Sequence, residues 1–148
     1  MTTLNRISGL HHYAYRCRNA EETRSFYEDL LGLPLAHVIQ ADSVPSTGAS
    51  DPYVHLFFEY ADGSYIAFFD LGDEIPCTPD PKTPPWVNHF AMQVKTVAEV
   101  EEWKTRLQAA DIEVIGVTDH EFVKSIYFFD PNGIRLEITC EVIDESDR

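Results

Sequence analysis

One carboxylate interrupts an apolar strand pattern near the end of the chain. In residues 134–139, IRLEIT, apolar and polar side chains alternate as they do along a strand, and Glu137 lies in the middle of the polar side. A wetted sheet face is one interpretation, since antiparallel sheets often have one. A ligand-binding role is the other. Tyr127 and His120 precede Glu137, and the three groups together could bind or polarise a small molecule.

A tight turn separates two alternating runs around these residues. The turn is Asp130-Pro131-Asn132-Gly133, in which proline presets φ and the Asn and Gly accept the positive φ of a reversal. We therefore expect a β-hairpin, with Tyr127 before the turn and Glu137 after it.

Two histidines stand at matching places earlier in the chain. His12 and His89 each lie in an alternating, strand-like run, and fourteen residues separate them from Phe26 and Trp103 respectively. Each of these aromatic residues falls on the apolar stripe of a predicted helix. A lone strand histidine is more often a surface residue than a ligand, but the same register in two places favours a shared role.

The two helices have clear start and stop signals. Residues 19–32 begin with Asn19 as N-cap and end at Gly32, where a left-handed residue is favoured. Residues 96–111 begin with Thr96, and Glu99 completes a capping box.

The remaining strand patterns complete two copies of one module, strand, helix and three strands. Strands are expected near 9–18, 36–40, 53–60, 65–70, 87–95 and 112–117, and on both arms of the hairpin. Ala67 follows Gly63 by four residues, as Glu137 follows Gly133. The sequence thus predicts an α+β fold of two βαβββ modules.

These modules set the expected domain organisation, a single domain spanning 1–148. Five of the nine prolines fall in residues 71–86, which suit neither a helix nor a central strand. The expected parts are a first module at 9–70, a proline-rich connection at 71–86, a second module at 87–140 and an acidic tail at 141–148.

The repeat predicts a metal site. One strand face in each module can pack beneath its helix, while the opposite face presents His12, His89 and Glu137 beside small alanines. A curved sheet made of both modules would gather these three on its inner side. Two imidazoles and one carboxylate with open positions match the facial triad of Fe(II), and less selectively of Mn, Zn or Co.

Other candidate residues carry weaker signals. His55 shares a strand face with Phe57, and lining a substrate cavity and mere packing are both open for it. His11 is expected to point toward the helix side. The three cysteines, an odd number without a CxxC pair, indicate a reducing compartment and structural roles.

Composition excludes several partners. The chain has 148 residues, with 11 Lys and Arg against 25 Asp and Glu and a formal net charge of −14. Nucleic acid and anionic membranes attract basic surfaces, so neither is an expected partner. The N-terminus lacks a signal-peptide pattern, and no apolar run reaches the roughly 18 residues of a membrane span. We expect a cytoplasmic protein with a small-molecule substrate.

Several segments resemble one superfamily. The runs HHYAY, NHFAM, FYEDLLGL and DPNGIRLEI look like the vicinal-oxygen-chelate superfamily, which contains glyoxalases, bleomycin-resistance proteins, fosfomycin-resistance thiol transferases and extradiol dioxygenases. The likeness extends from about Leu10 to Thr139. It implies the glyoxalase/bleomycin-resistance/dihydroxybiphenyl dioxygenase fold, a cupped and mostly antiparallel sheet around a divalent metal, and a homodimer. Whether one chain or two build each site stays open.

The last hairpin is similar to the signature of type I extradiol ring-cleavage dioxygenases. The matching positions are Thr118, His120, Ile126, Tyr127, Asp130, Pro131, Gly133 and Glu137. This resemblance implies His12, His89 and Glu137 as iron ligands, and Tyr127 and His120 as hydrogen-bonding groups at the substrate oxygens. It implies an oxidoreductase acting on a small catechol-like or otherwise vicinally oxygenated substrate.

The chain departs from these family patterns at three places. Residues 72–88 contain no histidine, although extradiol enzymes of this type carry an acid-base histidine before the second metal ligand. The fourth ligand of glyoxalase I falls on Ala67, and a threonine of the fosfomycin-resistance transferases falls on Ala14. Two alternatives therefore stay open: a non-redox metalloenzyme, such as a lyase, isomerase or thiol transferase, and a metal-free protein that sequesters its ligand.

Overall fold

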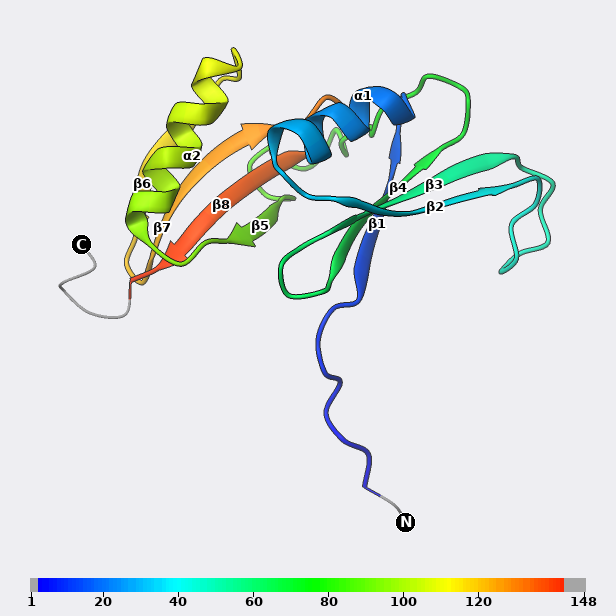
Figure 1. Ribbon diagram of the computed structural model, residues 1–148, viewed down its shortest axis with the longest axis horizontal. Helices are drawn as coiled ribbons and strands as arrows, with labels where there is room; N and C mark the ends of the chain where they lie inside the picture. The colour runs from blue at the N-terminus through cyan, green and yellow to red at the C-terminus, as the bar shows by residue number, and fades with distance from the viewer. Residues whose placement is uncertain (1–2, 143–148) are drawn as a thin grey trace. The chain divides into compact units, whose positions relative to one another are not determined.

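The chain folds as two compact units of the same design (Figure 1). The computed structural model describes residues 3–142. One unit extends to Pro76 and the other begins at Cys77, so the boundary falls within the proline-rich stretch. The acidic tail was predicted at 141–148. Residues 143–148 of it lie outside the described residues.

The first unit contains four strands and one helical segment. Its elements are β1 (His12–Cys17), α1 (Ala20–Arg24), η1 (Ser25–Leu30), β2 (Leu35–Ala41), β3 (Tyr53–Glu59) and β4 (Tyr65–Asp70). The strands form a sheet in the order β1-β4-β3-β2, in which β1 and β4 are parallel and the other pairs antiparallel.

The second unit repeats this arrangement. Its elements are β5 (Phe90–Gln93), α2 (Val97–Ala109), β6 (Ile115–His120), β7 (Val123–Phe129) and β8 (Arg135–Glu141). The sheet order is β5-β8-β7-β6, again with one parallel pair, β5 and β8. The prediction of an α+β fold built from two βαβββ modules is confirmed.

The first helical segment begins as predicted and then widens. The Asn19 side chain accepts a hydrogen bond from the Glu22 amide at 2.8 Å, and Gly32 has φ +73° after the segment ends. The predicted single helix is wrong in one respect, because residues 25–30 are π-helical. There the Leu31 amide bonds to the Phe26 carbonyl, five residues back.

The second helix follows its predicted cap. Thr96 accepts from the Glu99 amide at 3.1 Å, while the Glu99 carboxylate accepts from the Lys95 amide at 3.2 Å. The buried side chains Val100 and Leu107 lie on one stripe, and α2 packs on β7 and β8. Among the described helices, none is long and apolar enough to cross a membrane.

Several strands differ from their predicted bounds. The strand expected at 9–18 is His12–Cys17, so His11 precedes it. The strand expected at 87–95 is only Phe90–Gln93, because a turn closed by the Val87 amide and the Pro84 carbonyl precedes it. The strand expected at 112–117 is Ile115–His120, because the Ile112 amide still bonds back to Leu107 at the end of the helix. His89 consequently lies just before β5.

The hairpin turn between β7 and β8 is held by one aspartate. Asp130 accepts from the amides of Asn132 and Ile134 at 2.9 and 2.8 Å, and Gly133 supplies the positive φ of +85°. The expected positive φ at Asn132 is wrong. Its amide and side chain bind Asp130 instead, and its carbonyl accepts from Cys77.

Each sheet has one face covered by its helical segment and one open face. In the first unit Tyr27 packs on Phe58 and Phe68, with ring centroids 5.5 and 4.9 Å apart. In the second unit the covered face contributes Ile126, Phe128, Leu136 and Ile138, all buried. Since side chains alternate along a strand, the residues between these belong to the open faces.

Candidate metal-binding site

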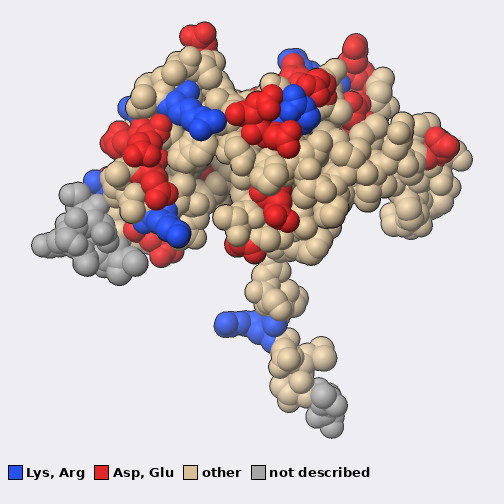
Figure 2. All heavy atoms as spheres, in the orientation of Figure 1, with Lys and Arg blue, Asp and Glu red and all other residues tan. Residues whose placement is uncertain are grey.

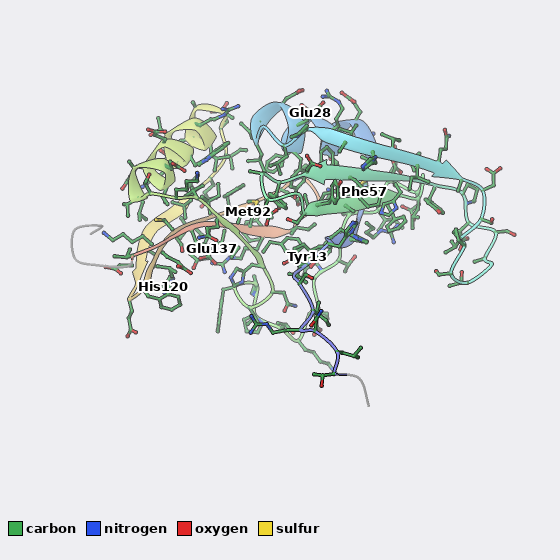
Figure 3. The ribbon with its side chains drawn as sticks, turned by 60° about the horizontal axis from the view of Figure 1, so that its bottom comes forward. Tyr13, Glu28, Phe57, Met92, His120 and Glu137 are labelled. Atoms are coloured by element: carbon green, nitrogen blue, oxygen red, sulfur yellow. The ribbon has the colours of Figure 1, made fainter. Side chains whose placement is uncertain are left out.

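The open face of the second unit gathers the predicted chemical groups on neighbouring strands. Tyr127 on β7 pairs with Glu137 on β8, and Ser125 pairs with Thr139. Paired residues point to the same side of a sheet, so these four side chains share one face. Figure 3 shows Glu137 and His120 in this unit, on the side of the strands away from α2.

Glu137 and His89 form a close pair. The Glu137 residue is buried, with 6% of its surface exposed, and its Oε1 lies 2.9 Å from His89 Nε2. The second ring nitrogen of His89, Nδ1, lies 2.9 Å from the Val87 carbonyl oxygen. A carbonyl only accepts, so Nδ1 carries a proton, and in the neutral ring Nε2 then has a lone pair.

This geometry fits a cation. A neutral His89 directs the lone pair of Nε2 at an oxygen of the ionised carboxylate 2.9 Å away. Both atoms are then acceptors and repel each other, so a proton or a metal ion is needed between them. Neighbouring ligands of an octahedral ion with bonds of about 2.1 Å are about 3 Å apart. Imidazole and carboxylate are ligands that Fe, Mn, Co and Zn accept. The two donors therefore suit such an ion.

Tyr127 and His120 lie beside this pair and contact each other. The Tyr127 hydroxyl is 3.0 Å from His120 Nε2, and the Arg135 guanidinium stacks 4.2 Å from the centre of the Tyr127 ring. Burial, and next the charge of Glu137, raise the pKa of Tyr127. The phenol therefore keeps its proton at neutral pH and is able to donate it in a hydrogen bond.

Ser125 is a part of this cluster that the sequence analysis missed. Its side chain is fully buried, and its hydroxyl lies 2.5 Å from Glu137 Oε2 and 2.8 Å from Thr139 Oγ1. A usable signal was present, because Ser125 stands two residues before Tyr127 and so on the same strand face.

His12 lies on the open face of the first unit. It begins β1, is exposed, and its Nδ1 is 2.8 Å from His11 Nδ1, so its Nε2 remains available to a ligand. The expectation that His11 points toward the helix side is wrong. Its ring lies 5.4 Å from that of Tyr65, the register partner of His12 on the open face.

His55 lies within an aromatic cluster on the same open face. Its ring stacks on Phe69 with centroids 3.7 Å apart and lies 4.2 Å from Phe57. Burial, and next the nearby His12, lower the pKa of His55. In the part of the chain that the structure describes, its buried Nε2 has no hydrogen-bond partner. The packing role is observed, and substrate binding stays a prediction.

The two modules differ at the carboxylate position. Ala67 lies between Ala14 and Phe57 in the first sheet, as Glu137 lies between Ala91 and Tyr127 in the second. Only the second module therefore offers a carboxylate there.

The predicted ligands are divided between the units. His89 and Glu137 lie together in the second unit, with Tyr127 and His120 beside them, and His12 belongs to the first. Within residues 3–142 no group of three or more His, Cys, Asp or Glu side chains is assembled as a metal site. The triad of His12, His89 and Glu137 stays a prediction.

A family model described as the Glyoxalase/Bleomycin resistance protein/Dioxygenase superfamily matches residues 9–138. The chain belongs to this superfamily. A curated relative named Glyoxylase I 4, from Arabidopsis thaliana, is 26% identical over 89% of this chain and 70% of its own length. The superfamily membership agrees with the resemblance read from the sequence.

Two solved structures share the fold of this superfamily member. The fosfomycin resistance protein FosX from Listeria monocytogenes, a mutant in complex with Mn(II) and a dihydroxypropylphosphonic acid, has a TM-score of 0.66 and 20% identity, covering 97% of this chain and 100% of its own. A lactoylglutathione lyase from Agrobacterium tumefaciens has a TM-score of 0.62 and 22% identity, covering 91% of this chain and 95% of its own.

Proposed function

We propose that this protein is a metal-dependent enzyme that uses His12, His89 and Glu137 to hold a divalent ion, and that it cleaves the ring of a small catechol next to its vicinal oxygens. The observation that carries the proposal is the close contact of Glu137 Oε1 with His89 Nε2, whose other nitrogen is already committed to a carbonyl. The donor set favours Fe(II), with Mn, Zn or Co as alternatives.

The third ligand, His12, belongs to the first unit, and it would come from the same chain or from a second copy in a homodimer. The geometry supports the assignment, because His11 occupies only Nδ1 and, among residues 3–142, Nε2 of His12 has no hydrogen-bond partner. The described cysteines are not joined in disulfides, which supports work in a reducing compartment such as the cytoplasm.

The side chains around the ion would perform distinct tasks. Bound Fe(II) would supply Lewis acidity and a path for electrons between a catecholate and dioxygen. When His120 Nε2 carries a proton, it donates a hydrogen bond to the phenol oxygen of Tyr127. The Tyr127 proton is then available to donate to an oxygen of the substrate. Arg135, stacked on the Tyr127 ring, would help to hold the ring in this orientation.

Proton transfer in ring opening needs a residue that the proline-rich stretch does not supply. Residues 71–86 contain no histidine, so the extradiol acid-base group is absent from its usual place. His120 is the imidazole in hydrogen-bond contact with Tyr127, and we assign the proton transfer to it. His55 would line the substrate side through Nε2, which has no hydrogen-bond partner among the described residues.

A non-redox reaction on the same ligands is a second candidate. The relatives that support it are a glyoxalase-named protein and a fosfomycin resistance protein that holds Mn(II) with a vicinal-diol phosphonate. Such chemistry needs a polarising ion and a hydrogen-bond donor, which the same residues would provide. The substrate would then be a small molecule with two adjacent oxygens rather than a catechol.

Dioxygen uptake separates these candidates. Protein loaded with Fe(II) under anaerobic conditions is mixed with a panel of catechols and air-saturated buffer. Glu137→Ala is the inactive variant, and His37→Ala, which removes an exposed imidazole on β2, is the matched control. Uptake by the wild type and His37→Ala that is lost in Glu137→Ala supports ring cleavage. If iron is bound but no dioxygen is taken up, the non-redox candidate is favoured. If no metal is bound, the protein is better described as one that sequesters its ligand.

A further inference from the structure

The two oxygens of the Glu137 carboxylate have different neighbours. Oε1 lies 2.9 Å from His89 Nε2, whereas Oε2 lies 2.5 Å from the Ser125 hydroxyl. An ionised carboxylate only accepts hydrogen bonds, so Ser125 donates its single proton to Oε2. One oxygen is therefore held by the protein, and the other is left for the ion of the proposed function.

Thr139 completes a chain of hydroxyls behind this contact. With its proton given to Glu137, Ser125 is an acceptor toward Thr139, whose Oγ1 is 2.8 Å away. Thr139 therefore donates to Ser125 rather than to the Lys124 carbonyl oxygen, which lies farther away, 3.4 Å from its Oγ1, and Ser125 donates to Glu137. Ser125 is fully buried, so water does not compete for this contact.

We infer that Ser125, oriented by Thr139, is a positioning residue that makes Glu137 bind the divalent ion through one oxygen, Oε1, in a fixed direction. The inference rests on the proposed metal site and adds how that site is tuned. A carboxylate with both oxygens free binds metals through one or both of them, which changes the coordination number. Groups that bond to a ligand in this way orient it and adjust metal affinity.

The first module provides an internal comparison. There Ala67 takes the place of Glu137, and the residues in the positions of Ser125 and Thr139 are His55 and Phe69. The hydroxyl pair is thus absent from the module that lacks the carboxylate. The Ser125 and Thr139 hydroxyls thus occur in the module that has the carboxylate, as expected if their role is to position Glu137.

The experiment uses Co(II) alone as the probe. Co(II) is titrated into the apo forms of the wild type, Ser125→Ala and Thr139→Val, while affinity and the visible absorption bands that report coordination are recorded. We expect Ser125→Ala to bind Co(II) about ten- to a hundredfold more weakly, because Glu137 loses the bond that orients it. The absorption bands should change as well, because Oε2 becomes free to reach the ion. Thr139→Val, which keeps the Ser125 donor, should shift both readouts in the same direction by less.

Ser64→Ala is the matched control. Ser64 also donates to a carboxylate at 2.5 Å, that of Asp62, but in an exposed turn of the first unit. The Ser64→Ala variant should have the same Co(II) affinity and visible spectrum as the wild type. If Ser125→Ala fails to fold, Thr139→Val decides the test.

The outcomes are distinguishable. Wild-type protein that does not bind Co(II) would overturn the proposed function and, with it, this inference. Wild-type binding with unchanged affinity and bands in both hydroxyl variants would overturn the inference alone.

Discussion

The carbonyl of Val87 decides which nitrogen of His89 faces Glu137. Because Nδ1 is committed at 2.9 Å, Nε2 is the atom that approaches the carboxylate. Loss of either Glu137 or His89 would leave the other without its close partner. The chemistry at this scale depends on fixed directions of individual atoms rather than on the presence of residue types.

His55 makes the stability of the fold depend on pH. Its pKa is lowered in the folded protein, first by burial, so the unfolded chain takes up this proton at a higher pH, near 6.5. The free energy of unfolding should therefore fall as the pH drops from 7 toward 5. In His55→Phe, which retains a flat ring against Phe69, this loss should be smaller.

Urea unfolding at pH 7 and pH 5 measures the effect. His37→Phe, which removes an exposed imidazole from the neighbouring strand β2, is the matched control. If the free energy of unfolding falls as much between pH 7 and pH 5 in His55→Phe as in the wild type, then His55 is not the source of this pH dependence.

At the residue scale, alternation along strands predicted the faces but not the hydrogen bonds. It placed Tyr127 on one arm of the hairpin and Glu137 on the other, and register then made them partners. The bond from Ser125 to Glu137 is diagonal across two strands, so it depends on that register, which the sequence does not fix alone. His11 was misplaced because it precedes β1, where alternation no longer applies.

Among the elements, strand β6 depends on a close approach of two backbones at Gly116. A Cβ there would lie 2.7 Å from the Ser125 carbonyl oxygen and 2.9 Å from the Thr118 amide nitrogen, and φ is +109°. Gly116→Ala should therefore lower the free energy of unfolding by about 2 kcal/mol or more. Gly9→Ala, whose Cβ would have no neighbour within 4 Å, should be nearly neutral.

Chemical denaturation of both glycine variants tests this prediction. Since Ser125 also contacts Glu137, Gly116→Ala is expected to weaken metal binding as well. If the two variants have equal free energies of unfolding, then β6 accommodates a Cβ at position 116 without loss of stability, which would contradict the prediction.

The cap of α2 is a second test at this scale. Thr96→Ala removes the acceptor of the Glu99 amide and should cost about 1 kcal/mol of stability. Thr105→Ala, an exposed position on the same helix whose hydroxyl bonds to the Glu101 carbonyl, is the matched control. Thermal unfolding that ranks the two variants in the opposite order would contradict the capping role.

Caps, turns and periodicity were sufficient to predict the order of the elements. Asn19, Thr96 and Gly133 act as their residue types indicate. The π-helical turn after Arg24 was not predictable from periodicity, because a single wider turn changes the spacing by only one residue. The late start of β6 depends on the way α2 ends, which is a matter of tertiary contacts.

For the whole molecule, the charge balance is the property that the sequence defined best. The formal net charge is −14, and acidic side chains cover more of the displayed face than basic ones do (Figure 2). Like charges repel in the folded state, and salt screens that repulsion. Raising NaCl from low ionic strength to physiological values should raise the midpoint of thermal unfolding, by roughly 4 °C for about 1 kcal/mol of stabilisation.

Choline chloride at the same ionic strength is the control, because screening does not depend on the identity of the cation. An increase in midpoint with NaCl alone would indicate specific cation binding instead, and no increase with either salt would contradict the screening argument.

The proposed metal site is tested by retention of a divalent ion. Wild-type protein and the variants His12→Ala, His89→Ala, Glu137→Ala and His37→Ala are loaded anaerobically with Fe(II) or with Mn(II), passed through a desalting column and analysed for metal per chain. We expect about one ion per chain in the wild type and in the control His37→Ala, and near-complete loss in the other three. Equal retention in Glu137→Ala and the wild type would contradict the metal site on which the proposed function depends.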